Sequence, residues 1–388
     1  MKNKKKMPDH DLDNIMPLLI QQWRRYLGIR GPEDVLQTRE FRGVVKAVMD
    51  MDKNFQHKDL IDNNYFSSRE HLAAYLMYYW PMHYQEGLSL INELPRPPRR
   101  VLDIGSGPAP YAFAALQHGA TDVYATDLHL DAVTLGAKIC GRHGKTLTVR
   151  EWNCRKDQCP VEGKFDLIIL AHTLEEIFPR EIKGWRDDQD IFIQSLISKL
   201  TPDGYLMIVD NSRLSTNHRI LEIRDSLVEQ GLPVQAPCVW KGKCPALQTK
   251  NSPCYAQRDF VRPYVVKEIQ RAARFKQSSL KMSYLIMGNL DAKWPLLPEK
   301  QLYRVISPPI DSFNGPAFYL CGVDGKKKLS SHIKEHSKDT RSFDYLKRGE
   351  LISIEGALEE GNHLHIIEGT KVKIEAACGK SIDDVMKG

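Results

Sequence analysis

The sequence predicts an α/β protein organised around a Rossmann-like sheet, and three observations support this fold class. From residue 100 onward, short apolar runs alternate with helix-forming stretches, as in the repeated βα units of a parallel sheet. The first apolar run leads into Asp103-Ile-Gly-Ser-Gly107, which is typical of a strand that turns tightly into a helix. The second run ends at Asp127, 24 positions after Asp103, where a carboxylate can accept both hydroxyls of a ribose. We therefore predict a nucleoside-binding unit here.

Residues 1–95 are predicted to form an N-terminal helical region, because large apolar side chains recur there at helical spacing, as at Leu19, Trp23 and Leu27. A stiff, proline-rich linker follows and leads into the Rossmann-like core, which we place at 96–231 and 283–290. Predicted core strands lie near 100–104, 122–127, 146–151, 165–171, 204–210 and 283–288, and predicted helices near 111–118, 130–142, 188–200 and 217–230.

Two further segments complete the predicted organisation. Residues 232–282 are interpreted as an insertion, because cysteines, prolines and basic side chains crowd into a stretch without clear periodicity. Residues 302–388 alternate short apolar runs with turn residues, which predicts a small C-terminal β-rich module. The strands expected in this module are Tyr303–Ile306, Ala317–Leu320, Leu351–Glu355, His363–Ile367 and Lys371–Glu375.

The composition restricts the cellular setting. No run of about 18 apolar residues occurs, so no membrane span is predicted. The lysine-rich N-terminus resembles neither a secretory signal nor a mitochondrial transit peptide. We therefore expect a cytoplasmic, bacterial protein, or a mitochondrial matrix protein only if a transit peptide has been removed. Eight cysteines in such a reducing compartment indicate buried thiols or metal ligands rather than disulfides.

The Asp103–Gly107 turn resembles the first motif of class I S-adenosylmethionine methyltransferases. Pro110 takes the place of the third glycine of a dinucleotide fingerprint, which disfavours NAD. In a methyl-donor site, the two glycines would pass beside the methionine and ribose, with Asp103 at the ammonium group and Asp127 at the ribose hydroxyls. Two polar side chains after the third and fourth strands would face the adenine and the substrate. The predicted cofactor-binding residues are thus Asp103, Gly105, Gly107, Asp127, Asn153 and His172.

The residues after the fourth strand do not indicate a catalytic residue. It reads Ala171-His-Thr-Leu-Glu-Glu176, without the Asp/Asn-Pro-Pro-aromatic signature of enzymes that methylate amino groups of nucleic acids. A nucleophilic cysteine, which a cytosine-C5 enzyme requires, is also absent from this stretch. His172 is interpreted either as a general base or as a polar residue that lines the pocket. Methyl transfer depends mainly on positioning, so catalysis is left open.

Four cysteines form a candidate metal site. Cys238 and Cys244 are separated by five residues, Cys254 follows after nine, and Cys321 lies far along the chain. Four thiolates suit either a zinc ion or an iron–sulfur cluster, and a metal would order a loop that has little core of its own. Two alternatives remain open: unrelated buried thiols, or a site that uses the Cys154 and Cys159 pair.

A basic segment accompanies the cysteines. Residues 238–350 carry 21 Lys and Arg against 10 Asp and Glu, while the whole chain has a net charge of only +6. This asymmetry favours a polyanionic partner such as RNA, although a solvated helix face would give the same pattern. The predicted RNA-binding residues are Lys241, Lys243, Arg258, Arg262, Lys267, Arg271 and Arg274.

These motifs together resemble one family. Their order along the chain is similar to that in the mitochondrial small-ribosomal-subunit methyltransferase-like family, which includes methyltransferase-like protein seventeen and bacterial relatives. The motifs in order are the glycine turn, the Cys-x₅-Cys-Pro loop from Cys238, Ser283-Tyr-Leu, Arg304-Val-Ile and Leu320-Cys-Gly-Val-Asp-Gly. The resemblance implies a class I methyltransferase fold, a [4Fe–4S] cluster and a role in small-subunit assembly. Carried over by motif, the cluster ligands are Cys238, Cys244, Cys254 and Cys321.

Three functions follow as hypotheses. The first is an assembly factor that binds small-subunit rRNA, S-adenosylmethionine and the cluster, and is monomeric away from the ribosome. The second is an active rRNA methyltransferase. The third is a small-molecule or protein methyltransferase with a structural zinc site. The missing catalytic signatures favour the first over the second, and the basic segment favours both over the third.

Overall fold

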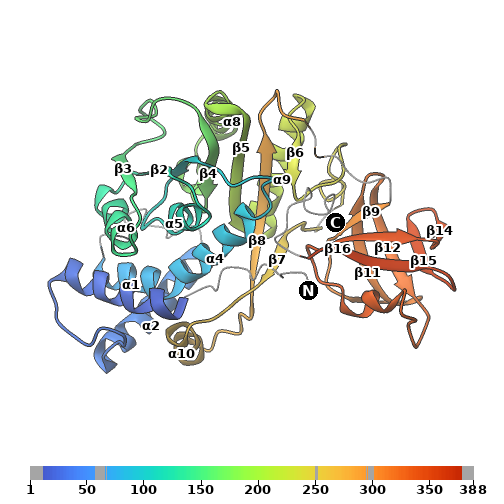
Figure 1. The fold of residues 1–388 in the computed structure, drawn as a ribbon, viewed down its shortest axis with the longest axis horizontal. Helices are drawn as coiled ribbons and strands as arrows, with labels where there is room; N and C mark the ends of the chain where they lie inside the picture. The colour runs from blue at the N-terminus through green and yellow to red at the C-terminus, as the bar shows by residue number, and fades with distance from the viewer. Residues whose placement is uncertain are drawn as a thin grey trace, which may run out of the picture.

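The computed structural model describes residues 12–56, 66, 68–249, 252–293, 295 and 301–377. Within these residues, a core with helices on both faces of a sheet is followed by a second sheet at the C-terminal end (Figure 1). The predicted α/β fold class with a Rossmann-like sheet is confirmed. The parts of the predicted helical region and β-rich module that fall at 1–11 and 378–388 lie outside the described residues.

The main sheet has the strand order β3-β2-β1-β4-β5-β8-β6, and β7 also pairs with β8. Neighbouring strands among β1 to β5 are parallel, whereas β8 runs antiparallel to β5, β6 and β7. The chain order reverses at β1 and β4, so the carboxyl ends of these strands open a crevice for a ligand. The bounds are β1 Arg100–Ile104, β2 Asp122–Asp127, β3 Thr148–Glu151, β4 Phe165–Ala171, β5 Leu200–Asn211, β6 Val234–Ala236, β7 Ala256–Asp259 and β8 Ser279–Gly288.

Both faces of the main sheet are covered, because successive strand residues point into two different apolar cores. Val101 and Leu167 belong to one core, whereas their chain neighbours Leu102 and Ile168 belong to the other. The first core lies under α5, α6 and α10, and the second under α8 and α9. The bounds are α5 Pro110–Gln117, α6 Leu130–Arg142, α7 Leu174–Ile177, α8 Trp185–Ile197, α9 Leu214–Glu229 and α10 Tyr264–Ala273.

The N-terminal region is helical, as predicted, and it packs on the first core rather than standing apart. The indole of Trp80 donates to the carbonyl of Pro108 over 3.0 Å, which joins this region to the glycine turn. None of the described helices is long and apolar enough to cross a membrane. The elements are α1 Leu12–Leu27, α2 Thr38–Gln56, α3 Arg69–Ala74, the π-helix η3 Tyr75–Tyr79 and α4 Trp80–Ile91.

The C-terminal residues form a second sheet with an apolar core of its own. Its strand order is β14-β15-β12-β11-β9-β13-β16, with β10 paired to β11, and a short 3-10 helix precedes β13. The bounds are β9 Leu302–Val305, β10 Ile310–Ser312, β11 Gly315–Gly322, β12 Gly325–Ser331, η4 Arg341–Tyr345, β13 Leu351–Glu355, β14 Leu358–Glu360, β15 His363–Ile366 and β16 Lys371–Ala376.

The segment 232–282 differs from the expected insertion. β6 and β7 both pair with β8, so parts of this segment belong to the main sheet. β8 itself begins at Ser279 instead of 283, because its first residues pair with β7. The turn expected at Pro202-Asp-Gly204 lies inside β5, next to an irregularity in its pairing with β4. The segment also contains helix α10, and the described residues of the cysteine-bearing stretch between β6 and β7 form no helix or strand.

Candidate functional site

The main cavity opens at the carboxyl ends of the parallel strands, where the strand order reverses. It has a volume of about 720 Å³. Loops after β1, β2, β3, β4 and β5 form its floor, and side chains of η3 and α4 close it from the N-terminal side. Residues that line it include Gly105, Gly107, Asp127, Asn153, His172, Glu176, Asp210, Tyr75, His83 and Glu86.

The glycine turn requires the absence of side chains at two positions. Gly105 and Gly107 have φ angles of +64° and +51°, a region that residues with a Cβ rarely adopt. A Cβ on Gly105 would also lie 2.1 Å from Oγ1 of Thr173. The turn therefore brings bare backbone to the cavity wall, as the sequence predicted.

Asp103 is not among the residues that line this cavity, so its contact with a ligand stays a prediction. Its carboxylate accepts hydrogen bonds from Oγ of Ser106 at 2.8 Å and from the backbone N–H of Ala112 at 3.0 Å. Asp103 is buried, which raises the pKa of its carboxyl to about 7. Its role is to fix the turn and the first residues of α5.

Asp127 and Asn153 both line the cavity, in agreement with their predicted placement. The carboxylate of Asp127 accepts the N–H groups of Gly107 at 2.7 Å and His129 at 2.8 Å. Burial raises the pKa of Asp127. Oδ1 of Asn153 accepts the N–H of Arg155 at 3.2 Å, which holds the side chain in the loop after β3.

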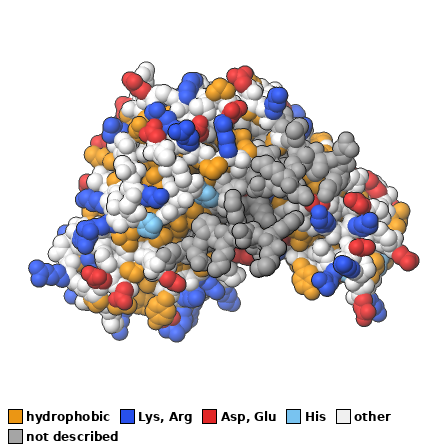
Figure 2. All heavy atoms as spheres, viewed as in Figure 1, with side chains coloured by type: hydrophobic (Ala, Val, Ile, Leu, Met, Phe, Trp, Pro, Cys, Tyr) orange, Lys and Arg blue, Asp and Glu red, His pale blue; other side chains and the backbone are white. Residues whose placement is uncertain are grey.

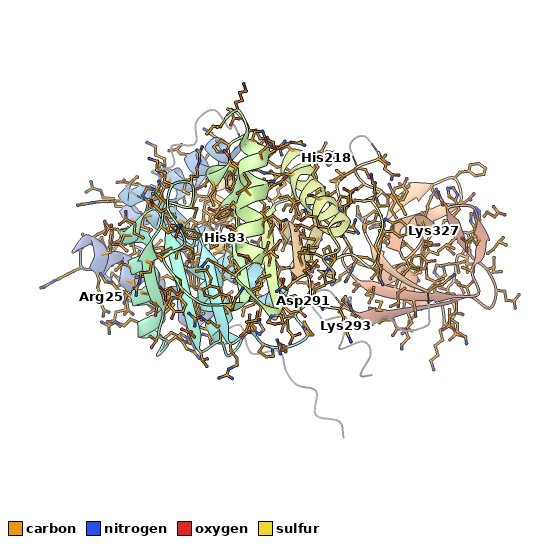
Figure 3. The ribbon with its side chains drawn as sticks, turned by 90° about the horizontal axis from the view of Figure 1, so that it is seen from above. Arg25, His83, His218, Asp291, Lys293 and Lys327 are labelled. Atoms are coloured by element: carbon orange, nitrogen blue, oxygen red, sulfur yellow. The ribbon has the colours of Figure 1, made fainter. Side chains whose placement is uncertain are left out.

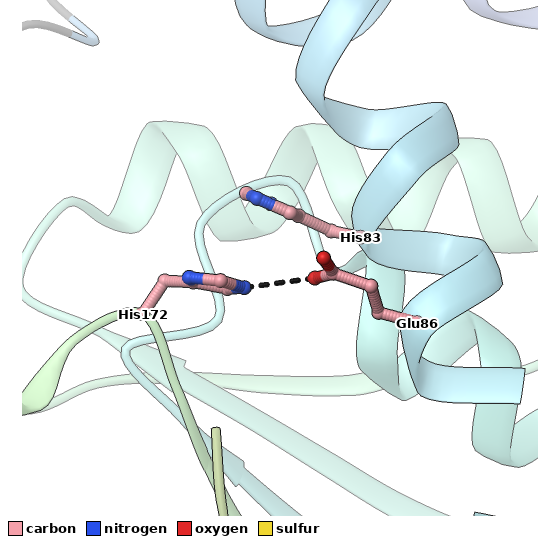
Figure 4. Close-up of side chains that lie close together, drawn as sticks. All are labelled: His83, Glu86 and His172. Atoms are coloured by element: carbon pink, nitrogen blue, oxygen red, sulfur yellow. Dashed lines mark hydrogen bonds and ion pairs between the residues drawn. The ribbon is translucent and has the colours of Figure 1, made fainter. Parts of the chain in front are cut away.

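His172 lies at the inner end of the cavity in a histidine–carboxylate cluster (Figure 4). Its Nε2 is 2.9 Å from Oε2 of Glu86, and its Nδ1 is 3.9 Å from Oδ1 of Asp210. The ring of His83 stacks on that of His172, with centroids 4.2 Å apart and planes inclined by 16°. Figure 3 shows His83 within the α/β core, away from the C-terminal module that carries Lys327. The cluster thus joins α4 to the end of β4.

The protonation of this cluster follows from its burial and charges. Burial disfavours the imidazolium of His172, but the carboxylates of Glu86, Asp210 and Glu176 together outweigh it, so the pKa of His172 is raised. Burial and the neighbouring His172 hold the pKa of His83 well below its usual range. Burial, with the charges of Asp127 and Asp210, raises the pKa of Glu176 to about 8. The cavity is therefore lined by buried acids that a cationic ligand would hold ionised.

The sequence reasoning missed His83 and Glu86. Both come from α4, which is distant in sequence from the Rossmann motifs. One signal was present: two ionisable residues three positions apart share a helix face, here within a stretch rich in aromatic residues. Nothing in the local pattern shows that this face meets the end of β4.

The cysteines predicted as ligands come from two parts of the fold. Cys238, Cys244 and Cys254 lie between β6 and β7, and Cys321 lies on β11. Burial raises the pKa of Cys254 well above its usual value, and negative charge on the other three thiols raises it further. Among the described residues, no three cysteine sulfurs lie within 4.8 Å of one another.

Side chains of α9 hold the cysteine stretch. Asn217 donates to the carbonyl of Cys254 at 2.6 Å and accepts its N–H at 2.9 Å. Asp225 accepts the N–H of Cys244 at 2.9 Å. The guanidinium of Arg224 donates to the carbonyls of Trp240 and Gly242. These contacts position backbone that forms no regular element of its own.

Arg258 does not belong to the predicted RNA-binding surface. It is only 5% exposed and forms a buried ion pair with Glu93, next to the hydroxyl of Tyr284 at 3.3 Å. The period-2 pattern of β7 points Arg258 inward, whereas the sequence reading treated it as loop. Arg262 is half-buried and donates to Gln270 at 3.2 Å.

The other predicted RNA-binding side chains are exposed. Figure 2 shows Lys and Arg side chains along the edge of the molecule that α10 forms in Figure 1. Two of the cations have acidic neighbours: Lys243 lies 3.3 Å from Glu229, and Arg271 lies 2.6 Å from Glu268. The exposed set is Lys241, Lys243, Lys267, Arg271 and Arg274.

Comparison with models of known families shows the family to which this chain belongs. The model of the family described as mitochondrial small ribosomal subunit Rsm22 matches residues 69–349. The chain belongs to the Rsm22 family. The match begins with α3 and continues through the main sheet, the cysteine stretch and the second sheet to the start of β13. It confirms the resemblance to a class I methyltransferase-like family that the motifs indicated.

Individual relatives of this Rsm22-family chain match shorter stretches. It is 33% identical over 97 residues to a ribosomal protein L11 methyltransferase of Lactobacillus helveticus, covering 24% of this chain and 30% of that protein. A ribosomal protein L11 methyltransferase of Lactobacillus gasseri is 40% identical over 86 residues, covering 21% and 26%. The chain thus matches less than a third of the length of either relative.

Solved structures similar to this Rsm22-family chain include further methyltransferases. The ribosomal protein L11 methylase of Lactobacillus delbrueckii subsp. bulgaricus aligns with a TM-score of 0.30 and 22% identity, covering 40% of this chain and 69% of that one. The N-methyltransferase NodS of Bradyrhizobium japonicum, in complex with S-adenosyl-L-homocysteine, aligns with a TM-score of 0.33 and 15% identity, covering 53% and 85%.

Proposed function

We propose that this protein is a small-ribosomal-subunit assembly factor that binds rRNA, S-adenosylmethionine and a [4Fe–4S] cluster. The observation that carries the proposal is the family match, which spans the methyl-donor cavity, the four cysteines and the basic helix in one continuous segment. Such a factor would work as a monomer when off the ribosome. Its compartment would be the cytoplasm of a bacterium, or the mitochondrial matrix if a leader has been removed.

The cavity suits S-adenosylmethionine by shape and by charge. Bare backbone at Gly105 and Gly107 lets the ligand approach closely, and Asp127 retains lone pairs for the ribose hydroxyls. Asn153 offers an amide to the adenine edge. The buried carboxyls of Glu176 and Asp210 favour a ligand that carries a sulfonium and an ammonium group, because positive charge offsets their burial.

The cysteine stretch suits an anionic iron–sulfur cluster held by Cys238, Cys244, Cys254 and Cys321. Nε of Arg224 and Nη2 of Arg304 are buried without a hydrogen-bond partner among the described residues. Arg304 also donates to the carbonyl of Pro237 at 3.0 Å. Burial would lower the pKa of Arg224, but negative charge on Cys238, Asp225 and Cys244 outweighs it, so the pKa is raised. Four thiolates can hold either a [4Fe–4S] cluster or a zinc ion, and the family resemblance favours the cluster.

The exposed cations support binding to an rRNA backbone. Contacts of this kind position an RNA without reading its sequence, and they release counterions. We expect charge reversal at Arg271 and Arg274 to lower rRNA affinity and to reduce the slope of log affinity against log salt by about 0.7 to 0.9 per lost contact. Filter binding at several salt concentrations measures both, with Lys371→Glu on the second sheet as the matched control. An unchanged slope would mean that the RNA contacts another surface.

Association with the ribosome provides the direct test of the proposed function. The full-length tagged protein should co-sediment with immature small subunits and not with large subunits. Co-sedimentation with neither would overturn the assembly role, even if S-adenosylmethionine binds. The alternative of an active rRNA methyltransferase predicts a methylated nucleoside that disappears from rRNA digests when the protein is deleted. Asp127→Ala should abolish that nucleoside if catalysis occurs.

A further inference from the structure

The inner end of the cavity carries three potential metal ligands. One ligand atom each from His83, Glu86 and His172 lies within 4.8 Å of the others, and this is the only such group among the described residues (Figure 4). Glu86 is buried, and the two histidines are partly buried on the cavity wall. We propose that His83, Glu86 and His172 bind a divalent transition-metal ion, of the class of zinc, iron(II) or cobalt(II), beside the methyl-donor pocket.

Each proposed ligand has an outer partner that would orient it. Nδ1 of His83 lies 3.2 Å from the hydroxyl of Tyr75 and, when protonated, donates to it, so that Nε2 is left for the ion. The hydroxyl of Tyr111 donates to Glu86 over 3.1 Å. Asp210 faces Nδ1 of His172 at 3.9 Å, which leaves Nε2 on the side of Glu86. Histidines and carboxylates that bind metals usually have such partners, because these fix the tautomer and the ring orientation.

The backbone around the cluster is unusual in two places. His172 has a φ of +57°, a left-handed conformation that costs free energy for a residue with a side chain. The π-helix Tyr75–Tyr79 lies one turn before His83, and single π turns within α-helices often occur at functional sites. Both features set the direction of a proposed ligand, His172 directly and His83 through Tyr75.

The chemistry of the ligands selects the class of ion. Two imidazoles and one carboxylate suit zinc and iron(II), whereas magnesium and calcium prefer oxygen alone. Three protein ligands leave coordination positions open to the cavity, where water or an oxygen or nitrogen atom of a methyl acceptor could bind. An ion lies close to the plane of each imidazole that holds it. The stacked rings of His83 and His172 must therefore open when the ion binds.

Cobalt(II) titration of the full-length, cluster-containing protein tests the site. In difference spectra against the same protein before Co²⁺ is added, we expect one equivalent of Co²⁺ to give the weak d–d absorption of nitrogen and oxygen ligands, without new intense sulfur-to-metal bands of cysteine ligation. Glu86→Gln and His172→Ala should lose this absorption, whereas His332→Ala, at an exposed histidine of the C-terminal module, should keep it. Tyr75→Phe should weaken binding about 10- to 100-fold, because it removes only an outer partner.

A measurement on the wild-type protein does not depend on the folding of variants. Zn²⁺ should shift the imidazole NMR signals of two of the thirteen histidines, and S-adenosylmethionine binding is measured separately. Absence of d–d absorption in the wild type, or equal Co²⁺ binding by Glu86→Gln and His172→Ala, would overturn the metal site. Zn²⁺ that shifts no histidine signal would do the same.

Discussion

At the scale of single residues, Gly105 and Thr173 show how closely the cavity wall is built. The turn after β1 packs against Thr173, the residue that follows His172, so the loops after β1 and β4 touch at this point. No side chain fits between them, because a Cβ on Gly105 would overlap Oγ1 of Thr173 at 2.1 Å. The glycine is therefore needed for packing as well as for its backbone angle.

Gly105→Ala should lower both the melting temperature and S-adenosylmethionine affinity. Overpacking costs about 1–3 kcal/mol, and a left-handed backbone adds about 1–2 kcal/mol for a residue with a Cβ. Gly144→Ala is the matched control, since Gly144 has a φ of +71° and nothing within 4 Å of the added Cβ. Thermal unfolding and calorimetry should show a small loss for Gly144→Ala and a larger one for Gly105→Ala. Equal losses would mean that Thr173 yields readily.

Glu176 should make stability depend on pH. Its folded pKa of about 8 lies above the ordinary value of 4.5 for a glutamate, so folding favours the protonated form. The stability it contributes is complete below about pH 4.5 and is lost as pH rises through 8. Relative to Glu176→Gln, the free energy of unfolding of the wild type should fall by at most about 1.4 kcal/mol per pH unit in this window. Denaturant unfolding of both proteins at pH 5 to 8 measures this, with Asp187→Asn on the surface as control. The same dependence of unfolding free energy on pH in the wild type and in Glu176→Gln would contradict the prediction.

At the scale of elements, the sequence pattern predicted the helices and strands whose own residues supply enough apolar side chains. β13 lies where it was expected, at Leu351–Glu355, and the helices of the core shift by only a few residues. β12 was missed, because Lys326-Lys-Lys328 reads as an exposed turn. Pairing with β11 and β15 makes it a strand, and Leu329 fills the core of the second sheet. Such tertiary pairing leaves no local signal.

The same limit applied to the candidate site. The glycine turn, Asp127, Asn153 and His172 follow strands of a recognisable βα pattern, so their meeting at one sheet edge could be predicted. His83 and Glu86 reach that edge only because α4 packs against α5. No pattern in the sequence predicts that contact between the two helices. The prediction that Arg258 lies on the RNA-binding surface was wrong for a different reason. Its charge suggested an exposed position, but Glu93 provides a buried partner for it.

α9 should control how well the cysteine stretch is ordered. Asn217 makes two partly buried hydrogen bonds to the backbone of Cys254 and a buried one to Ser283 at 3.0 Å. Asn217→Ala should therefore cost about 1–3 kcal/mol through unsatisfied backbone groups and reduce bound iron. Glu222→Ala, on the exposed face of α9, should change neither by a measurable amount. Iron content that is full in Asn217→Ala would show that the cluster orders the stretch without α9.

At the scale of the whole molecule, the cysteine stretch lies where the α/β core meets the second sheet. Arg304 of β9 donates to the carbonyl of Pro237, at the start of the cysteine stretch, and Arg348 stacks over the ring of Tyr255 at 3.8 Å. A cluster held by Cys321 and the three cysteines of the core would add a covalent link across this junction. The cavity at the switch point is lined by none of these four cysteines, so we expect it to keep its form when the link is lost.

Cys321→Ser should therefore separate the two halves of the proposed function. Losing one thiolate should release the iron and loosen the second sheet from the core, because metal binding contributes folding free energy at such a site. Iron and sulfide content and rRNA affinity should fall together, while S-adenosylmethionine affinity measured by calorimetry should stay close to that of the wild type. Cys140→Ser, a buried thiol of α6 away from the stretch, is the matched control for the chemical change alone. Full iron content in Cys321→Ser, with loss in Cys154→Ser or Cys159→Ser, would move the ligand set to the loop after β3.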